Sequence, residues 1–251
     1  DASLSPEEKN GISVKLSALH PRYEAVNEAR VHAELYPRLL ALCEDAAKAN
    51  INLCLDAEEA DRLVISLQLL ERLMREPSLK GWSGLGLAVQ AYQKRAQDVI
   101  KRLSELAGET GMRLMVRLVK GAYWDTEIKH AQEEGMVNFP VFTTKHGTDI
   151  NYLACAHALL QAGPRIYAQF ATHNAHSLAT ILIMAEAEGV TNYEFQRLHG
   201  MGEPLYGAAE KGDKVRVYAP VGAHKDLLPY LVRRLLENGA NTSFVHSFLD
   251  P

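Results

Sequence analysis

Short apolar runs alternate along the chain with longer amphipathic stretches. The runs with strand character span residues 12–17, 51–56, 85–91, 113–119, 140–144, 166–172, 192–198 and 215–221. Between them, for example over 23–50 and 57–75, Leu and Ala recur three and four positions apart among charged residues, which predicts helices. Alternating strands and helices favour parallel strands joined by right-handed crossovers. Eight such units would close a (β/α)8 barrel. Periodicity alone leaves an open doubly wound sheet as the alternative, but no GxGxxG turn follows the first run.

Glycine and proline positions support these boundaries. Gly111 and Gly189 follow helical stretches, where a left-handed C-cap suits glycine, and Pro140 and Pro164 precede expected strands. The polar, glycine-rich segment 200–214 predicts a short helix followed by a mobile loop. No repeat or linker interrupts the series, so we expect a single domain.

Composition narrows the class of protein. The chain has 251 residues, of which 47% are hydrophobic and 23% charged, as expected of a globular domain with a sizeable core. A formal net charge of −4 disfavours nucleic-acid binding. Cys43, Cys54 and Cys155 are widely spaced with no CxxC, which argues against a disulfide framework or a zinc site. With no signal peptide or membrane-length apolar run, we expect a cytoplasmic protein, and the lack of an initiating Met favours a piece of a longer chain.

Polar side chains recur at the carboxyl ends of the expected strands, where parallel barrels carry their chemistry. They are Lys15, Ser17, Asp56, Gln90, Arg117, Lys120, Tyr123, Thr143, Thr144, Lys145, Gln169, Thr172, His173, Asn174, Gln196, Arg197, His199 and Tyr218. Solvated loops would explain any one of them, but aligned sets from every strand favour a site. The cations there outnumber the acidic groups, and Gly121 would let a ligand approach the backbone, which predicts binding of a carboxylate together with a pyrophosphate.

The adjacent pair Arg233 and Arg234 lies in an apolar helical stretch after the last strand, which carries Tyr218. Placing two neighbouring guanidiniums there costs free energy unless an anion accepts hydrogen bonds from them. An anionic ligand is therefore one interpretation, and a pair of surface salt bridges is the other.

Five long motifs resemble one known family. The segments VKLSALHPRYE (14–24), VRLVKGAYWDTE (116–127), QFATHNAHS (169–177), FQRLHGMGEPLY (195–206) and 218–245 closely resemble the proline dehydrogenase domain of bacterial proline utilization A proteins. The resemblance covers about 11–246, leaving 1–10 as a flexible N-terminal remnant and 247–251 as a tail. It implies a distorted (β/α)8 barrel that binds FAD. It also implies oxidation of L-proline to Δ1-pyrroline-5-carboxylate by hydride transfer to flavin N5.

The resemblance also implies a substrate site. Its members would be Lys15, Asp56, Leu118, Tyr123, Tyr218, Arg233, Arg234 and Glu237. The two arginines and Lys15 would hold the carboxylate of proline or of proline-like inhibitors. Tyr218 would pack on the pyrrolidine ring, and Asp56 would orient the cations. Because the reacting amine must be neutral, we expect the surrounding positive charges to lower its pKa.

A second set of residues would line the flavin. These are Gln90, Arg117, Val119, Lys120, Gly121, Ala122, Thr143, Thr144, Lys145, Thr172, His173, Asn174 and Phe244, with Arg117 near the redox-active face. The resemblance further implies a membrane quinone as electron acceptor, a parent protein peripheral at the inner membrane, and an aldehyde dehydrogenase domain in that parent. The family's N-terminal arm, which would supply an acidic gate partner for Arg233, is absent from this sequence, and the segment before the last strand is shorter than in many relatives.

Three other functions are weighed against this one. A metal-dependent hydrolase would use His146, Asp149, His173 and His176, but the nearby cations oppose a divalent metal. A Schiff-base aldolase would use Lys15 or Lys120. The barrel could also serve only as a scaffold, and binding of FAD distinguishes that possibility.

Overall fold

Seven parallel strands form one curled sheet. The computed structural model describes residues 3–208, 214–223, 225, 227, 228, 230–232 and 234. The strands are β1 (Gly11–Val14), β2 (Asn52–Leu55), β3 (Leu85–Gln90), β4 (Leu114–Val119), β5 (Ile166–Ala171), β6 (Tyr193–Leu198) and β7 (Val215–Tyr218). Each strand pairs in parallel with the next one along the chain. The order leaves β1 and β7 at opposite ends of the half-barrel.

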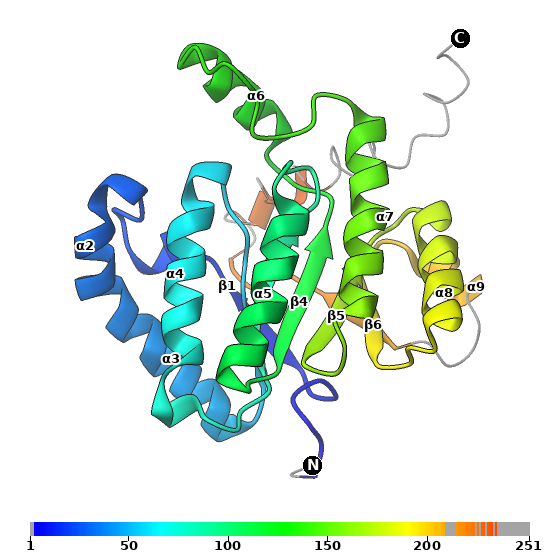
Figure 1. Ribbon diagram of the computed structural model, residues 1–251, viewed down its shortest axis with the longest axis horizontal. Helices are drawn as coiled ribbons and strands as arrows, with labels where there is room; N and C mark the ends of the chain where they lie inside the picture. Colours follow the sequence, from blue (N-terminus) through cyan, green and yellow to red (C-terminus); the bar gives the residue numbers. More distant parts are fainter. Residues whose placement is uncertain are drawn as a thin grey trace.

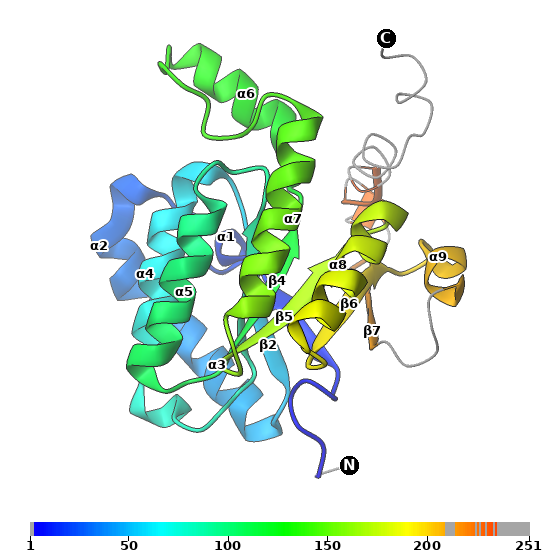
Figure 2. The ribbon, with the colours of Figure 1, turned by 45° about the vertical axis from the view of Figure 1, so that its right-hand side comes forward.

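Helices connect the strands and cover the outer face of the sheet. The described elements are α1 (Leu16–Leu19), η1 (Ala25–Asn27), α2 (Glu28–Arg30), η2 (Val31–Leu35), α3 (Tyr36–Ala49), η3 (Ala60–Arg62), α4 (Leu63–Met74), η4 (Pro77–Leu79), α5 (Ala96–Thr110), α6 (Trp124–Glu133), α7 (Lys145–Gln161), α8 (Ala175–Glu188) and α9 (Glu203–Ala208). Figure 1 shows α3, α4, α5, α7 and α8 side by side against the sheet, and the turned view in Figure 2 agrees. The fold belongs to the α/β barrel class, as the sequence predicted.

Along each strand, side chains point alternately to the apolar core and to the barrel interior. Leu53 and Leu55 of β2 and Val116 of β4 are buried in the hydrophobic core cluster that the helices cover. The residues between them in sequence point the other way, because side chains alternate across a strand. On that inner face Arg117 of β4 lies opposite Gln169 of β5 in the parallel register. The inside of the half-barrel is therefore polar.

The helix ends follow the expected chemistry. Gly111 ends α5 with φ of 69° and Gly189 ends α8 with φ of 65°, so both sequence-based C-caps are confirmed. Asn174 caps the start of α8, where its Oδ1 accepts a hydrogen bond from Ser177 N at 2.9 Å. This cap fixes the amino end of a fourteen-residue helix at the carboxyl edge of the sheet.

The prediction of a strand over 140–144 is wrong. Val141 makes one isolated antiparallel bridge with Gln93, and Phe142 N donates to Tyr92 O at 2.8 Å. The segment therefore pairs with the loop after β3, while β4 and β5 pair directly with each other. The segment leads into α7, where Thr144 is the N-cap and its side chain accepts a hydrogen bond from Gly147 N at 3.2 Å. The count of eight strands becomes seven within the described residues.

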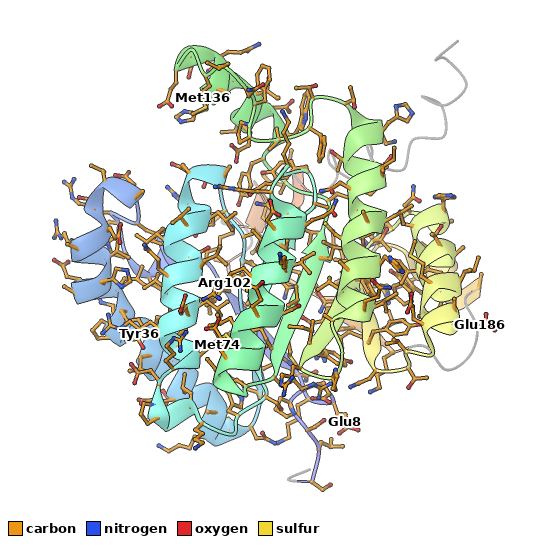
Figure 3. The ribbon with its side chains drawn as sticks, viewed as in Figure 1. Glu8, Tyr36, Met74, Arg102, Met136 and Glu186 are labelled. Carbon is orange, nitrogen blue, oxygen red and sulfur yellow. The ribbon has the colours of Figure 1, made fainter. Side chains whose placement is uncertain are left out.

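Helix α6 projects beyond the carboxyl ends of the strands (Figure 1). Met136, just after it, lies at the outer end of this projection (Figure 3). The short helix expected within 200–214 is confirmed as α9, whereas 209–213 lies outside the described residues. Among the described helices, none has the length and apolar character that would let it cross a bilayer.

The N-terminal segment is tied by side chains to β2 and to β7. Arg216 of β7 donates from Nη2 to Glu7 O at 2.7 Å and from Nη1 to Lys9 O at 2.6 Å. Asn52 of β2 donates from Nδ2 to Pro6 O at 3.1 Å. Side chains thus join the start of the chain to β2 and β7 without any β1–β7 ladder among the described residues.

Candidate active site

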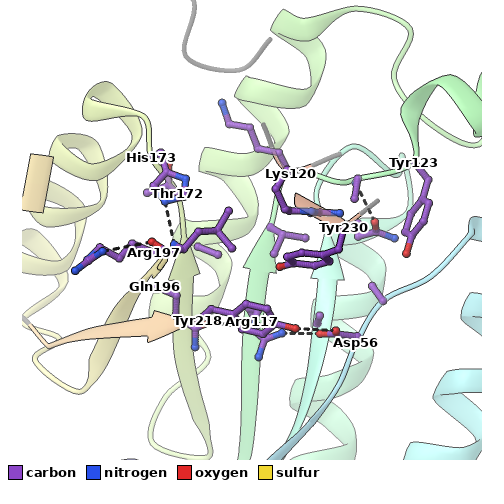
Figure 4. Close-up of a pocket in the computed structure, with 18 of the residues that line it drawn as sticks. Asp56, Arg117, Lys120, Tyr123, Thr172, His173, Gln196, Arg197, Tyr218 and Tyr230 are labelled. Carbon is purple, nitrogen blue, oxygen red and sulfur yellow. Dashed lines mark hydrogen bonds and ion pairs between the residues drawn. The ribbon is translucent and has the colours of Figure 1, made fainter. Parts of the chain in front are cut away.

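A cavity opens at the carboxyl ends of the strands. Each strand from β1 to β7 contributes to its wall, either through its own residues or through the loop that follows it. Its lining residues are Lys15, Asp56, Ala57, Ala88, Gln90, Arg117, Val119, Lys120, Ala122, Tyr123, Ala171, Thr172, His173, Asn174, Gln196, Arg197, Leu198, Tyr218, Tyr230 and Arg234. Figure 4 shows their side chains converging above the strand ends. Parallel pairing in register brings these groups together from across the sequence.

Arg117 is held at the floor of the cavity on three sides. Its Nη1 donates to Asp56 Oδ1 at 2.7 Å, its Nη2 to Ser13 Oγ at 2.6 Å and its Nε to Gln196 Oε1 at 2.8 Å. The guanidinium side chain is 10% exposed. Acceptors from three different strands therefore fix the plane of the fork, as pre-organisation of a buried cation requires.

Tyr218 shares Asp56 with Arg117. Its hydroxyl donates to Asp56 Oδ2 at 3.2 Å, and its ring centroid lies 5.0 Å from Arg117 Cζ (Figure 4). Burial, followed by the negative charge of Asp56, raises the pKa of Tyr218. The group is thus a neutral phenol at physiological pH, and it presents an aromatic ring beside a cation.

Two lysines in the wall have different partners. Lys15 Nζ donates to the Tyr123 hydroxyl at 2.5 Å and lies 5.3 Å from the ring centroid. Lys120 forms an ion pair with Asp149. Among the described residues, Lys15 has no carboxylate within ion-pair distance. Lys15 is therefore placed to meet an anionic ligand, whereas Lys120 is already paired with Asp149.

Gln90 and the turn at Gly121 add amide and backbone groups near these lysines. Ala122 N lies 3.4 Å from Gln90 Oε1, and Gln90 Nε2 donates to Glu58 O at 2.8 Å. Gly121 has φ of 140°, and a Cβ there would lie 2.4 Å from Tyr92 Cγ, so only glycine fits the turn. This turn and the amino end of α8 face one cavity, an arrangement that suits a phosphate-bearing ligand.

His173 and Thr172 are fixed by the loop at the start of α8. His173 Nε2 accepts the Leu198 amide at 3.1 Å, and Thr172 Oγ1 accepts the Asn174 amide at 3.1 Å. Among the described residues, no three His, Cys, Asp or Glu side chains gather as a metal site. Asp149 is engaged by Lys120, so the hydrolase interpretation lacks two of its proposed ligands.

Most of the expected site residues meet in this cavity. Those lining it are Lys15, Asp56, Gln90, Arg117, Val119, Lys120, Ala122, Tyr123, Thr172, His173, Asn174, Tyr218 and Arg234. Leu118 does not line it, because it lies on the outer face of β4 and is completely buried in the core cluster. Thr143, Thr144 and Lys145 are exposed around the N-terminus of α7, away from the cavity lining. Arg233, Glu237 and Phe244 lie outside the described residues.

Sequence reasoning missed several members of the site. Tyr230 lines the cavity with Arg234, whose Cζ lies 5.3 Å from its ring, and their spacing of four residues on a helix could have indicated a shared face. Ser13 is a partner of Arg117 that carried no distinct sequence signal. Gln196 stood out only as one polar residue among many at the strand ends.

Comparison with known proteins gives the family. Residues 1–247 match the family model for proline dehydrogenase. The chain is 58% identical to the bifunctional protein PutA of Salmonella typhimurium over 96% of its own length, which is 19% of that protein. It is 55% identical to PutA of Rhizobium meliloti over 96% of its length and 20% of that relative. The chain thus spans about a fifth of the length of these two relatives.

Solved structures agree with the sequence matches. A crystal structure of a variant of proline utilization A from Bradyrhizobium japonicum superposes with a TM-score of 0.91 at 59% identity, over 97% of this chain and 25% of that one. The protein from Bdellovibrio bacteriovorus gives a TM-score of 0.88 at 35% identity, over 94% of this chain and 25% of that one. Matches of this extent in sequence and structure establish that the chain belongs to the proline dehydrogenase family.

Proposed function

We propose that this domain oxidises L-proline to Δ1-pyrroline-5-carboxylate, with FAD at the carboxyl ends of the strands as the hydride acceptor. The observation that carries the proposal is the group of Asp56, Arg117 and Tyr218 at the cavity floor, where a buried cation and an aromatic ring share one carboxylate. Family membership supports the same reaction.

Positive groups at the cavity wall support recognition of a carboxylate. Arg234 lines the cavity from the segment after β7, and Lys15 lines it from the end of β1. A guanidinium offers two parallel donors to a carboxylate, and an ammonium adds a point charge. Arg233, which we expect to contribute a second fork, lies outside the described residues.

The rings of Tyr123 and Tyr218 support selection of a small cyclic substrate. Both line the cavity, and each is held by a polar partner at its hydroxyl, so the ring faces are positioned by hydrogen bonds. An aromatic face offers apolar contact to a saturated ring without a competing hydrogen-bond demand. The surrounding cations would lower the pKa of the substrate amine, which favours the neutral form that can lose a hydride from the adjacent carbon.

Other residues that line the cavity fit a dinucleotide. Gln90 and Lys120 offer amide and ammonium groups, Thr172 and Asn174 offer hydroxyl and amide groups at the amino end of α8, and Val119 and Ala122 offer apolar contact. When bound, FAD supplies the hydride acceptor that no side chain provides. Arg117 would stabilise negative charge that develops beside it, because its fork is already fixed by protein acceptors.

The onward steps are part of the same proposal. We infer that electrons pass to a membrane quinone, with the parent protein peripheral at the inner membrane. The product would pass to an aldehyde dehydrogenase domain in that parent, in keeping with the word bifunctional in the names of the relatives.

Anaerobic spectroscopy tests the proposal. Purified protein should bind FAD and be yellow, and its flavin absorption should bleach when L-proline is added. D-proline and L-pipecolate serve as matched controls for handedness and ring size, and bleaching should be slower with both. A protein that stays colourless after incubation with FAD would support the scaffold interpretation. Borohydride inactivation that depends on a carbonyl substrate would support a lysine Schiff base instead.

A further inference from the structure

The inner face of the half-barrel carries a chain of polar contacts that runs from the cavity floor toward the start of the chain. We propose that Gln196 is a positioning residue, whose side-chain amide is oriented by Glu194 so that it holds Arg117 in place. The inference rests on the proposed function for its effect on catalysis, whereas its structural part stands independently.

Gln196 makes one contact at each end of its amide. Its Oε1 accepts from Arg117 Nε at 2.8 Å, and its Nε2 donates to Glu194 Oε1 at 2.8 Å. Gln196 is 3% exposed and Glu194 is 2% exposed, so water does not compete for these bonds. The two residues are separated by one position on β6 and therefore point to the same face.

The chemistry of Glu194 decides which way the amide of Gln196 points. A carboxylate can only accept hydrogen bonds, so the neighbouring amide must turn its NH2 group toward Glu194. The amide oxygen then faces Arg117, which can only donate. If the amide were flipped, its oxygen would meet the carboxylate and its NH2 group would meet the guanidinium, so both ends of the Gln196 amide and Arg117 Nε would lose their hydrogen bonds.

Glu194 is itself held by hydrogen bonds from the neighbouring strands. Arg216 donates to it twice, from Nε at 2.7 Å and from Nη2 at 2.9 Å, and Tyr167 donates at 3.3 Å. The same guanidinium also binds the carbonyl oxygens of Glu7 and Lys9. The orientation of Arg117 is thus linked through Gln196 and Glu194 to Arg216 on the adjacent strand β7 and to the N-terminal segment.

Gln169 provides a matched control. It lies on β5, is 2% exposed, and donates from Nε2 to the same Glu194 Oε1 at 2.8 Å. It has no hydrogen bond to Arg117 and does not line the cavity. Gln169→Met and Gln196→Met therefore remove the same kind of buried amide from the same carboxylate, but only the second removes the acceptor of Arg117.

The test uses two readouts in the full chain. The first is the Nε–H signal of Arg117 in a ¹H–¹⁵N spectrum, assigned by its loss in Arg117→Lys and followed by its exchange with solvent. The second is turnover of L-proline. We expect Gln196→Met to shift this signal and speed its exchange. We also expect it to lower kcat on the order of 10- to 100-fold with a smaller change in KM, because Arg117 would lose its fixed plane. Gln169→Met should change both readouts much less, because Arg117 keeps its acceptor.

A double exchange, Glu194→Gln with Gln196→Glu, serves as the rescue. It returns an acceptor to Arg117 Nε and should restore the protected signal even if stability falls. The proposal is overturned if Gln196→Met leaves the Arg117 signal and kcat unchanged, if Gln169→Met changes them equally, or if the exchange restores nothing. Since the spectrum needs neither flavin nor proline, a wild-type protein without proline-dependent bleaching would contradict the proposed function while this readout still decides the role of Gln196.

Discussion

Arg117 and Asp56 form a largely buried ion pair, with Nη1 2.7 Å from Oδ1 and side chains 10% and 17% exposed. The two residues come from β4 and from the end of β2, which are separated in the sheet by β3. Their side chains meet because both point into the barrel interior. The pair both stabilises the fold and shapes the cavity floor.

Loss of Asp56 should leave a buried cation without its counter-charge. We expect Asp56→Ala to lower the free energy of unfolding by roughly 3–5 kcal/mol, the usual cost of removing one partner of a buried pair. Urea denaturation measures this change. Asp45→Ala, on the exposed side of α3, is the control and should change stability by less than about 0.5 kcal/mol. Equal effects of the two substitutions would contradict a structural role for the pair.

Removal of the Tyr218 hydroxyl should weaken binding of L-proline without abolishing it. Tyr218→Phe loses the hydrogen bond to Asp56 Oδ2 but keeps the ring near Arg117. A lost hydrogen bond of about 1 kcal/mol corresponds to a several-fold rise in KM for L-proline. Tyr218→Ser, which removes the ring, should raise KM further. The idea of ring packing fails if steady-state kinetics give the two variants the same KM.

Lys15 should act on substrate more than on cofactor. It lines the cavity, and among the described residues its hydrogen-bond partner is the Tyr123 hydroxyl, so its charge is available to a carboxylate. Lys15→Met should weaken proline binding while leaving the flavin absorption spectrum nearly unchanged. Titration of the anaerobic protein with a proline-like carboxylate measures the affinity. Loss of both binding and the spectrum to the same degree would indicate a structural role instead.

Glu127 should make stability depend on pH. Burial raises the pKa of this carboxyl, which accepts the Ala60 amide at 2.6 Å. The folded protein therefore holds this proton more tightly than the unfolded chain, and the associated stability is present below pH 4.5 and lost as pH rises through the folded pKa. Compared with wild type, Glu127→Gln should become progressively more stable as pH rises above 4.5. Urea denaturation at a series of pH values measures the difference.

Glu34 should make stability depend on pH in the opposite direction. Hydrogen bonds from Arg30 and then His20 lower the pKa of its carboxyl to about 2. Its contribution is present above pH 4.5 and is lost as pH falls toward 2, so the stability deficit of Glu34→Gln relative to wild type should be largest above pH 4.5 and disappear as pH falls to about 2. If both variants follow the same trend with pH, burial and pairing do not control these two groups.

The sequence predicted the parts of the fold that depend on one element at a time. Periodicity located all seven strands, and the glycines at 111 and 189 located two helix ends, because these signals reflect local geometry. It failed at 140–144, since a short β-branched segment can pair with a loop as readily as with a sheet. Only the tertiary hydrogen bonds to Tyr92 and Gln93 decide between them.

For the site, the sequence determined which residues are polar at the strand ends, and thirteen of the expected residues do line one cavity. It could not decide that Leu118 turns to the core, nor that Gln196 and Glu194 support Arg117 from within the barrel. Polarity and spacing are properties of the chain, whereas the partner of each inward side chain depends on strand register and on the curling of the sheet. The sequence therefore determined the kind of chemistry at this edge, and the tertiary structure decided which groups hold one another in place.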